Sequence, residues 1–275
     1  MEKFQLLPFT TIKGIGATSG LVYHDSSLFI VSDNSTFLYH YNINDKTLDK
    51  IKLFENSQEI IAKKDKADFE AITLFDNKLY LFGSGSTKKR DRRFTFHIES
   101  KEVKEKKLST IYNRLKEVIS LADDELNIEG VIITPNNIYY FQRGNGANAQ
   151  NGVFIFNRND NDNDKIQFIP FELPQIKNIS TTFTDAILVE DTIYFLAAAE
   201  NTTSTYDDGE IMGSVIGTID LKMMTLKSCL QISDKHKFEG LTLYKKTATQ
   251  IELLLCEDND SEELESNIYL LELPI

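Results

Sequence analysis

The feature that most constrains the fold is an internal repeat of about 55 residues. Similar segments begin at Thr18, Phe69, Ile128, Thr184 and Phe238, and the second of them reads FEAITLFDNKLYLFGSGS. A period of this length is typical of propellers, solenoids and other repeat architectures. Because the five copies account for nearly the whole chain, the repeat indicates the architecture of the protein and not only a local motif.

Each repeat predicts up to four strands. A largely apolar strand is followed by a short polar turn such as Asp76-Asn77, which suits a tight hairpin, and by a second strand that is apolar almost throughout. A third strand and a more polar fourth strand follow, but the fifth repeat stops after its third strand. The N-terminal segment EKFQLLPFT can supply the missing strand, so we expect residues 1–12 to complete the last unit of a closed ring.

The sequence therefore predicts one all-β domain over residues 1–275, a five-bladed β-propeller with four-stranded blades. A twenty-stranded barrel fits less well, because apolar second strands suit blades packed face to face and not an alternating barrel wall. Residues 109–124, STIYNRLKEVISLADD, depart from the repeat and place Ile111, Leu115 and Val118 at helical spacing. This insertion predicts a short helix, either a lid over one face or a cover for a gap.

Composition bounds the partners and the compartment. The chain has 30 Lys and Arg against 42 Asp and Glu, and its formal net charge of −12 argues against nucleic acid or an anionic membrane as the main partner. Cys229 and Cys256 lie in apolar runs and are expected to be free thiols. The sequence shows neither a signal peptide nor an apolar stretch of about 18 residues, so we expect a cytoplasmic monomer without a membrane span.

The first residues of the inner strands form the candidate site. These strand heads lie 51, 59, 56 and 54 residues apart, and their equivalence should bring them together around the axis: Ser19, Glu70, Glu129, Asp185 and Glu239. Four ionised carboxylates in a narrow channel repel one another, so the ring must take up protons or a cation. Oxygen ligands favour Ca²⁺ first and Mg²⁺ second. The alternative is that these side chains cap backbone N–H groups of the neighbouring blade or bind only water.

The strand heads DFEAITL, NIEGVII and KFEGLTL resemble those of metal-centred propellers, including phytase-like and esterase-like bacterial proteins. The ring also resembles the calcium site of five-bladed calcium-activated nucleotidases (apyrases), and the chain is similar to bacterial propeller proteins with no assigned activity. The resemblance implies hydrolysis in some members and an axial calcium ion held by Ser19, Glu70, Glu129 and Glu239. Asp185 is shorter than the glutamate of that pattern, which implies contact with the ion through water.

Further candidate residues are expected at the same mouth of the channel. Asp33, Ser84 and Arg143 each follow their strand head by 14 residues, and we expect them to bind substrate. Arg143 would hold a phosphate or carboxylate, or else form a surface salt bridge. His236, close before Glu239, is the candidate general base. The loop GSGSTKK is not a nucleotide loop, because it lacks the Walker A spacing and leads into a strand.

Three functions stay open at this point. The first is a calcium-dependent hydrolase of small phosphoesters or esters, in which the ion would orient and polarise the substrate or a water. The second is a non-catalytic propeller that holds a structural cation and binds a ligand or a protein. The third is an interaction scaffold whose partner lies on the blade edges. The hydrolase would take a small anionic or polar ligand at the mouth.

Overall fold

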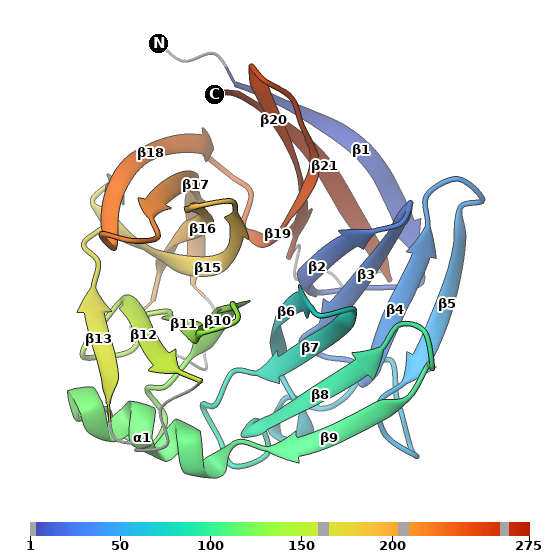
Figure 1. Cartoon of the computed structure of the whole chain (residues 1–275), viewed down its shortest axis with the longest axis horizontal. Helices are drawn as coiled ribbons and strands as arrows, with labels where there is room; N and C mark the ends of the chain where they lie inside the picture. The colour runs from blue at the N-terminus through green and yellow to red at the C-terminus, as the bar shows by residue number, and fades with distance from the viewer. Residues whose placement is uncertain (1–3, 159–164, 203–208, 259–263) are drawn as a thin grey trace.

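The protein folds into five antiparallel sheets set around a central axis, as Figure 1 shows in the view down that axis. The computed structural model describes residues 4–158, 165–202, 209–258 and 264–275. Four of the sheets have four strands, and one has a short additional strand. The expected five-bladed β-propeller is confirmed.

Each blade runs from an inner strand at the axis to an outer strand at the rim. The strands of blades one to three are β2 (Thr18–His24), β3 (Ser27–Ser32), β4 (Phe37–Asn42) and β5 (Thr47–Lys52); β6 (Phe69–Phe75), β7 (Lys78–Gly83), β8 (Arg92–His97) and β9 (Val103–Lys107); and β10 (Ile128–Ile133), β11 (Asn137–Gln142), β12 (Gly152–Asn157) and β13 (Ile166–Pro170). Those of blades four and five are β14 (Gln175–Ile176), β15 (Ile179–Val189), β16 (Thr192–Asn201), β17 (Glu210–Asp220) and β18 (Thr225–Ser233); and β19 (Phe238–Lys246), β20 (Gln250–Glu257), β21 (Glu265–Pro274) and β1 (Gln5–Lys13).

The ring is closed by the two ends of the chain. Strand β1 forms the outer edge of blade five and pairs antiparallel with β21, from Gln5 opposite Glu272 to Lys13 opposite Glu265. The pairing is interrupted by a register shift at Pro8, a residue that has no N–H to donate to a ladder. Figure 1 shows β1 beside β21 at this blade. The closure expected from the missing fourth strand is therefore present.

Tight hairpins join the first and second strands at the far end of the channel. Asp76 and Asn77 have φ values of 51° and 56°, and Asp25 and Ser26 have 47° and 59°. Two successive residues with positive φ make the hairpin turn whose twist matches the flanking strands, and Asn and Asp tolerate that conformation well. The polar turns thus return each second strand to the opposite end, where the strand heads lie.

The hydrophobic core is divided into five clusters, one between each pair of neighbouring blades. In the cluster between blades three and four, Phe183 makes edge-on contacts with Phe141 and Phe195 at centroid distances of 5.2 and 5.0 Å. Near the axis the inner strands approach closely, and a Cβ at Gly240 would lie 2.9 Å from the Gly20 backbone. Glycine after a strand head therefore allows adjacent blades to meet at the axis.

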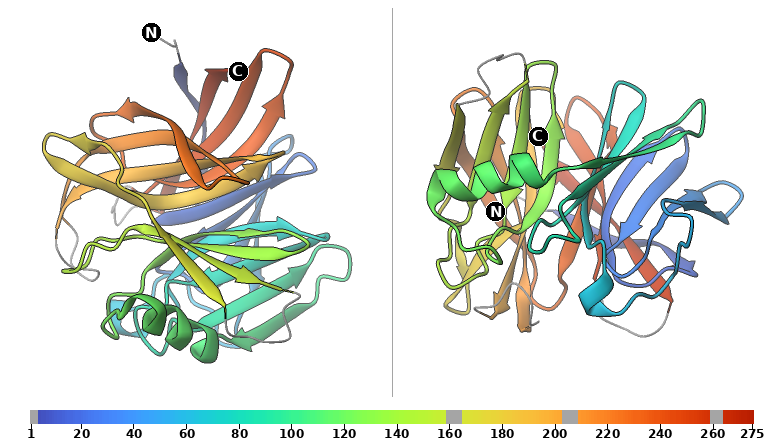
Figure 2. Two further views of the ribbon diagram at one scale, coloured as in Figure 1. Left: turned by 60° about the vertical axis from the view of Figure 1, so that its left-hand side comes forward. Right: turned by 90° about the horizontal axis from the view of Figure 1, so that it is seen from below.

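The insertion forms helix α1 (Ser109–Ile119), and a short 3-10 helix, η1 (Lys63–Asp65), precedes blade two. Tyr112 and Leu115 of α1 are buried in the cluster between blades two and three, and the Tyr112 hydroxyl donates to the Gly83 carbonyl oxygen at 2.8 Å. Figure 2 shows the helix on the outer flank of the propeller. It covers the seam between two blades and does not form a lid over the channel.

Within the described part of the chain, no helix has the length and apolar character needed to cross a membrane.

Candidate functional site

The strand heads lie at β-bulges of the inner strands. In each inner strand the pairing with the second strand skips one residue near the mouth, and the skipped residues are Ser19, Glu70, Glu129, Thr184 and Glu239. Bulges re-aim side chains and are common beside functional sites. In blade four the skipped residue is Thr184, whereas Asp185 pairs with Leu196. By strand register, Asp185 therefore lies one position beyond its expected equivalents.

The two hydroxyl residues of this ring connect neighbouring blades. Ser19 Oγ donates a hydrogen bond to the carbonyl oxygen of Phe69, and Thr184 Oγ1 donates to that of Phe238 at 2.7 Å. Phe69 and Phe238 directly precede the glutamate of the next blade. Ser19 and Thr184 thus hold the next strand head in place at equivalent positions of the ring.

Asp185 caps backbone groups of two inner strands. Its Oδ1 accepts a hydrogen bond from the Ala186 N–H, and its Oδ2 accepts one from the Leu241 N–H of blade five, each at 2.7 Å. Burial raises the pKa of Asp185 well above its usual value, although both hydrogen bonds act in the opposite direction. Asp185 therefore makes the capping contacts that the sequence offered as the alternative to a cation ligand.

Three carboxylates gather between blades one and two, and we call Asp33, Asp68 and Glu70 the acidic triplet. One oxygen from each lies within 4.8 Å of the others. Lys66 forms an ion pair with Asp33, and Arg90 Nη1 lies 2.7 Å from Asp68 Oδ2. Glu70 forms no hydrogen bond or ion pair with any described residue. The triplet therefore includes a carboxylate without a direct partner among the described residues, although the Lys66 ammonium lies near enough for the charge of Glu70 to help raise the pKa of Lys66.

The pKa values of all three carboxyl groups in the triplet are raised, which favours their neutral form. Burial raises the pKa of Asp33 to about 6, in spite of the Lys66 ammonium beside it. Burial, followed by repulsion from Asp68 and Glu129, raises the pKa of Glu70 well above its usual value. Burial also raises the pKa of Asp68 against the opposing charge of Arg90. Burial is the first cause of all three shifts, and for Asp33 and Asp68 it outweighs the opposing charges of Lys66 and Arg90.

Blades three to five contribute a second cluster, which we call the ionic network: Arg143, Lys237, Glu129, Glu200, Glu239 and Asp258. Arg143 Nη1 lies 3.3 Å from Glu129 Oε1 and 3.9 Å from Glu239 Oε1, and its Nη2 contacts Glu200 Oε2. Lys237 Nζ lies 2.8 Å from Glu239, 3.5 Å from Asp258 and 3.8 Å from Glu200. Each basic group is shared among three carboxylates.

Negative charge exceeds positive charge across this mouth. Among the described residues, the triplet and the network contain seven carboxylates. Four basic groups form ion pairs with them, Lys66, Arg90, Arg143 and Lys237, and Lys63 adds positive charge near Asp68. Two carboxylate oxygens, Glu129 Oε2 and Asp33 Oδ1, are buried without a hydrogen-bond partner. Glu129 itself is only 2% exposed. A buried, unpartnered oxygen is costly, and a bound cation would satisfy it.

The expected substrate-binding residues all lie near this mouth but already have protein partners. Asp33 belongs to the triplet and Arg143 to the network. Ser84 is fully buried, and its hydroxyl donates to Asp68 Oδ2 at 2.6 Å. These contacts make Ser84 a support for the triplet and leave Arg143 no free face for an anion beyond its buried Nε.

His236, the candidate general base, is directed toward blade five. Its Nδ1 lies 2.5 Å from Glu257 Oε1, and the ring packs against Phe238 and Tyr269 at centroid distances of 5.5 and 5.2 Å. The Tyr269 hydroxyl donates to the other oxygen of Glu257 at 2.9 Å. The imidazole is thus held in a polar contact of its own, apart from the acidic triplet.

Sequence reasoning missed several members of the site, and for some of them a signal existed. Asp68, Asn127 and Lys237 each stand two residues before a head glutamate, and alternate residues of a strand share one side. Asn127 Nδ2 donates to Glu129 Oε1 at 2.7 Å, and Lys237 pairs with Glu239. No comparable local signal marks Glu200, Asp258 or Arg90, because the folding of distant segments brings them to the mouth.

Comparisons with known proteins agree with this architecture. The structure is similar to Myxococcus xanthus glutaminyl cyclase (10% identity, 98% of this chain and 97% of that chain, TM-score 0.55) and to a luciferin-regenerating enzyme (10%, 98% and 95%, 0.52). It is also similar to the major Malassezia sympodialis allergen Mala s 1 (8%, 95% of each chain, 0.51). At such low identity these similarities show the fold alone.

Sequence comparisons narrow the relationship further. No curated protein sequence matches the chain. A family model matches residues 14–273, which span the five blades almost completely. The chain therefore belongs to the family of unknown function DUF6929.

Proposed function

We propose that the protein is a calcium-binding propeller whose central pocket takes a small anionic or polar ligand at the mouth of the channel. The observation that carries this proposal is the surplus of carboxylates there, with Glu129 Oε2 and Asp33 Oδ1 buried and unpartnered. Hard divalent cations bind carboxylate oxygens, and Ca²⁺ accepts the irregular arrangement of such ligands more readily than Mg²⁺ does. Calcium is therefore the first candidate and magnesium the second.

The acidic triplet supplies the proposed ligands. Its three oxygens already lie within 4.8 Å of one another, a separation that one cation can bridge with small side-chain movements. Glu129 and Glu239 add negative charge, since both raise the pKa of Glu70. Ser19 and Asp185, which the resemblance places in the ligand set, keep their backbone partners in this proposal.

Hydrolysis is one use of such a pocket. A calcium ion with open coordination positions would attract the phosphate or carbonyl oxygen of a small phosphoester or ester and polarise it or a water. Two observations favour the non-catalytic alternative, a ligand-binding propeller with a structural cation. Arg143 is engaged by three carboxylates, and His236 is held by Glu257.

Thermal melting tests the cation site. Calcium at about 100 times its Kd should stabilise the protein by about 2.7 kcal/mol, and a chelator should reverse the shift. The Asp68→Asn, Glu70→Gln double variant should lose the response. Asp76→Asn, at the far end of blade two, is the matched control and should keep it. A wild-type protein whose melting temperature ignores calcium would refute the proposal.

A substrate panel decides between the two uses of the pocket. Aryl phosphates, nucleoside diphosphates and lactones are incubated with the protein in calcium and in chelator. Turnover that disappears in chelator and in Glu70→Gln would establish a hydrolase. Calorimetric binding without turnover would establish the non-catalytic alternative.

A further inference from the structure

Blade two differs in charge from the rest of the molecule. Residues 63–107 contain 13 Lys and Arg and 8 Asp and Glu, a formal charge of +5 in a chain whose net charge is −12. The remaining residues therefore carry −17. Such an asymmetry produces a positive surface that attracts anions against a negative background.

A cavity of about 640 Å³ opens within this positive region, between the loop after β7 and helix α1. Its basic lining residues are Lys88, Arg92, Lys107 and Lys116. Gly85, Ser86 and Thr87 of the loop and Ser109 and Asn113 of α1 add hydroxyl, amide and backbone groups. This volume lies in the range of small-molecule sites, and the lining contains four basic residues against three acidic ones.

Two of these cations form no ion pair with a described residue, although Lys88 lies near enough to Asp123 to help lower the pKa of that carboxyl. Lys88 and Lys107 are exposed, and neither forms an ion pair with any described residue. Lys116 pairs with Asp123 at 2.9 Å, and Arg92 pairs with Glu105 at 3.1 Å. The cavity therefore retains the charge of two lysines that can turn toward a bound anion.

The acidic groups around the cavity only partly offset that charge. Asp123, Asp124 and Asp91 line it as well. Asp123 forms an ion pair with Lys116, and its side chain is fully exposed to solvent. Asp91 forms a hydrogen bond with the Ser109 side chain and lies near the charges of Lys116 and Arg92. Lys88 and Lys107 are thus the two basic lining residues that no ion pair with a described residue holds in place.

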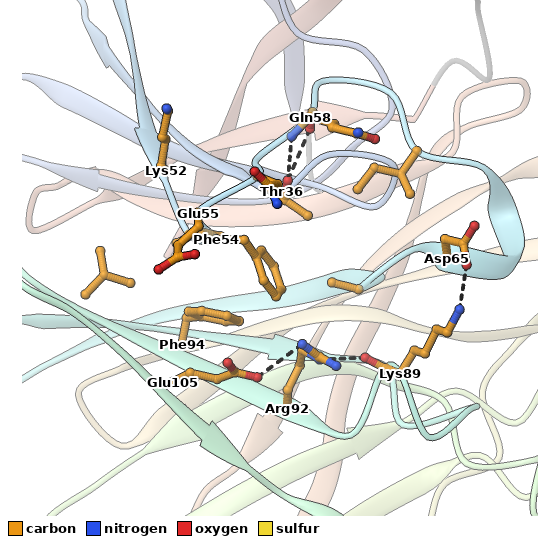
Figure 3. A pocket seen from close by; sticks show the side chains of 15 residues that line it. Thr36, Lys52, Phe54, Glu55, Gln58, Asp65, Lys89, Arg92, Phe94 and Glu105 are labelled. Carbon is orange, nitrogen blue, oxygen red and sulfur yellow. Dashed lines mark hydrogen bonds and ion pairs between the residues drawn. The ribbon is translucent and has the colours of Figure 1, made fainter.

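The neighbouring groove gives a contrast. A cavity of about 970 Å³ between blades one and two is also lined by basic residues, and Figure 3 shows two of them paired within it, Lys89 with Asp65 and Arg92 with Glu105. Lys89 lies 2.5 Å from Asp65, and the other face of Arg92, which also lines this groove, lies over the Phe54 ring. The lining of this groove contains three basic and three acidic residues, so its formal charges balance. Lys52 of this groove also forms no ion pair with a described residue, but the cavity beside α1 holds two such lysines and four basic against three acidic residues.

We propose that the cavity between the loop after β7 and helix α1 binds a small phosphorylated ligand. Lysine ammonium groups bind phosphate as mobile point charges, and the hydroxyl and amide groups of the lining can donate to its oxygens. This site uses no residue of the acidic triplet or the ionic network, so it stands independently of the calcium proposal.

Calorimetric titration with inorganic pyrophosphate in the presence of chelator provides the test. We expect binding that weakens at least tenfold in the Lys88→Ala, Lys107→Ala double variant and that declines with salt, as screened charges require. The matched control is Lys227→Ala, Lys245→Ala, which removes the same charge from exposed sites in blades four and five. This control should bind pyrophosphate as the wild type does.

Two results would overturn the site. One is a wild-type protein that does not bind pyrophosphate at millimolar concentration and low salt. The other is an equal loss of affinity in both double variants, which would assign the binding to overall charge. Because all four lysines are exposed, the variants should fold, and unchanged melting temperatures will verify this.

Discussion

The two sides of the channel mouth hold buried charge in different ways. In the ionic network, Arg143 and Lys237 each touch three carboxylates, so that the acids of blades three to five are joined into one unit. In the acidic triplet, Asp33 and Asp68 have one basic partner each and Glu70 has none. The comparison teaches that the partners of a carboxylate, more than its burial, separate a structural role from a capacity to bind.

Breaking the network should have the largest effect. Arg143→Met leaves Glu129, Glu200 and Glu239 without a shared cation, and removal of one member of a buried ion pair costs about 3–5 kcal/mol. Urea denaturation should report this loss in the free energy of unfolding. Lys227→Met, an exposed lysine on β18, is the control and should change little. A small loss in Arg143→Met would mean that the network is no tighter than the triplet.

Asp185→Asn should have the next largest effect. The amide retains one acceptor, so one of the two backbone N–H groups now served by Asp185 loses its partner, at a cost of about 1–3 kcal/mol. The calcium-induced shift in melting temperature should persist, because Asp185 is a cap in this structure. Loss of that shift with stability unchanged would instead make Asp185 an ion ligand.

Acidification should stabilise the chelated protein through the triplet. The pKa of Asp33 is about 6 in the folded protein and about 4 in the unfolded chain, so between these values the native state binds more protons. Stability then falls as the pH rises through this window and returns as the pH falls. We expect the melting temperature to rise by about 2–4 °C from pH 7 to pH 5. Asp33→Asn should flatten this profile.

Calcium should change this dependence of the melting temperature on pH. Protons and the ion compete for the same oxygens, so saturating calcium should remove the gain at low pH. If the melting temperature depends on pH in the same way with calcium and with chelator, the titrating group is not part of the ion site.

Glu70→Gln should have the smallest effect on the chelated protein. The substitution removes one repelling charge and breaks no hydrogen bond or ion pair with the described residues. The free energy of unfolding in urea should therefore change by less than about 0.5 kcal/mol or increase slightly. A loss of unfolding free energy as large as that of Arg143→Met would show that Glu70 stabilises the fold. The acidic triplet would then not differ from the ionic network.

The fold could be predicted from the sequence because the same pattern of strands and turns occurs in five copies. Alternating strands, polar turns and one missing strand determine the blade count and the closure without any knowledge of long-range contacts. The strand register of blade four could not be predicted in this way. The bulge places Thr184 in the ring and Asp185 beyond it, and only the pairing with β16 distinguishes them.

The site was predictable in part for a related reason. The head glutamates and Arg143 are visible in the repeat, but their partners are set by distant segments. Arg143 meets Glu200 from blade four, and Asp33 of blade one meets Lys66 before blade two. Whether a charged side chain forms an ion pair depends on such contacts between distant segments, and the repeat pattern in the sequence does not contain this information.

The pairing of β1 with β21 has a consequence for how the protein is made. A ribosome synthesises β1 before the other strands of the five blades, so the outer strand of blade five must wait for its partner until β21 has been made. Until then the nascent chain exposes open strand edges, which invite wrong pairing. Cotranslational folding can build the earlier blades one by one, but the ring can close only once β21 has been synthesised and meets β1.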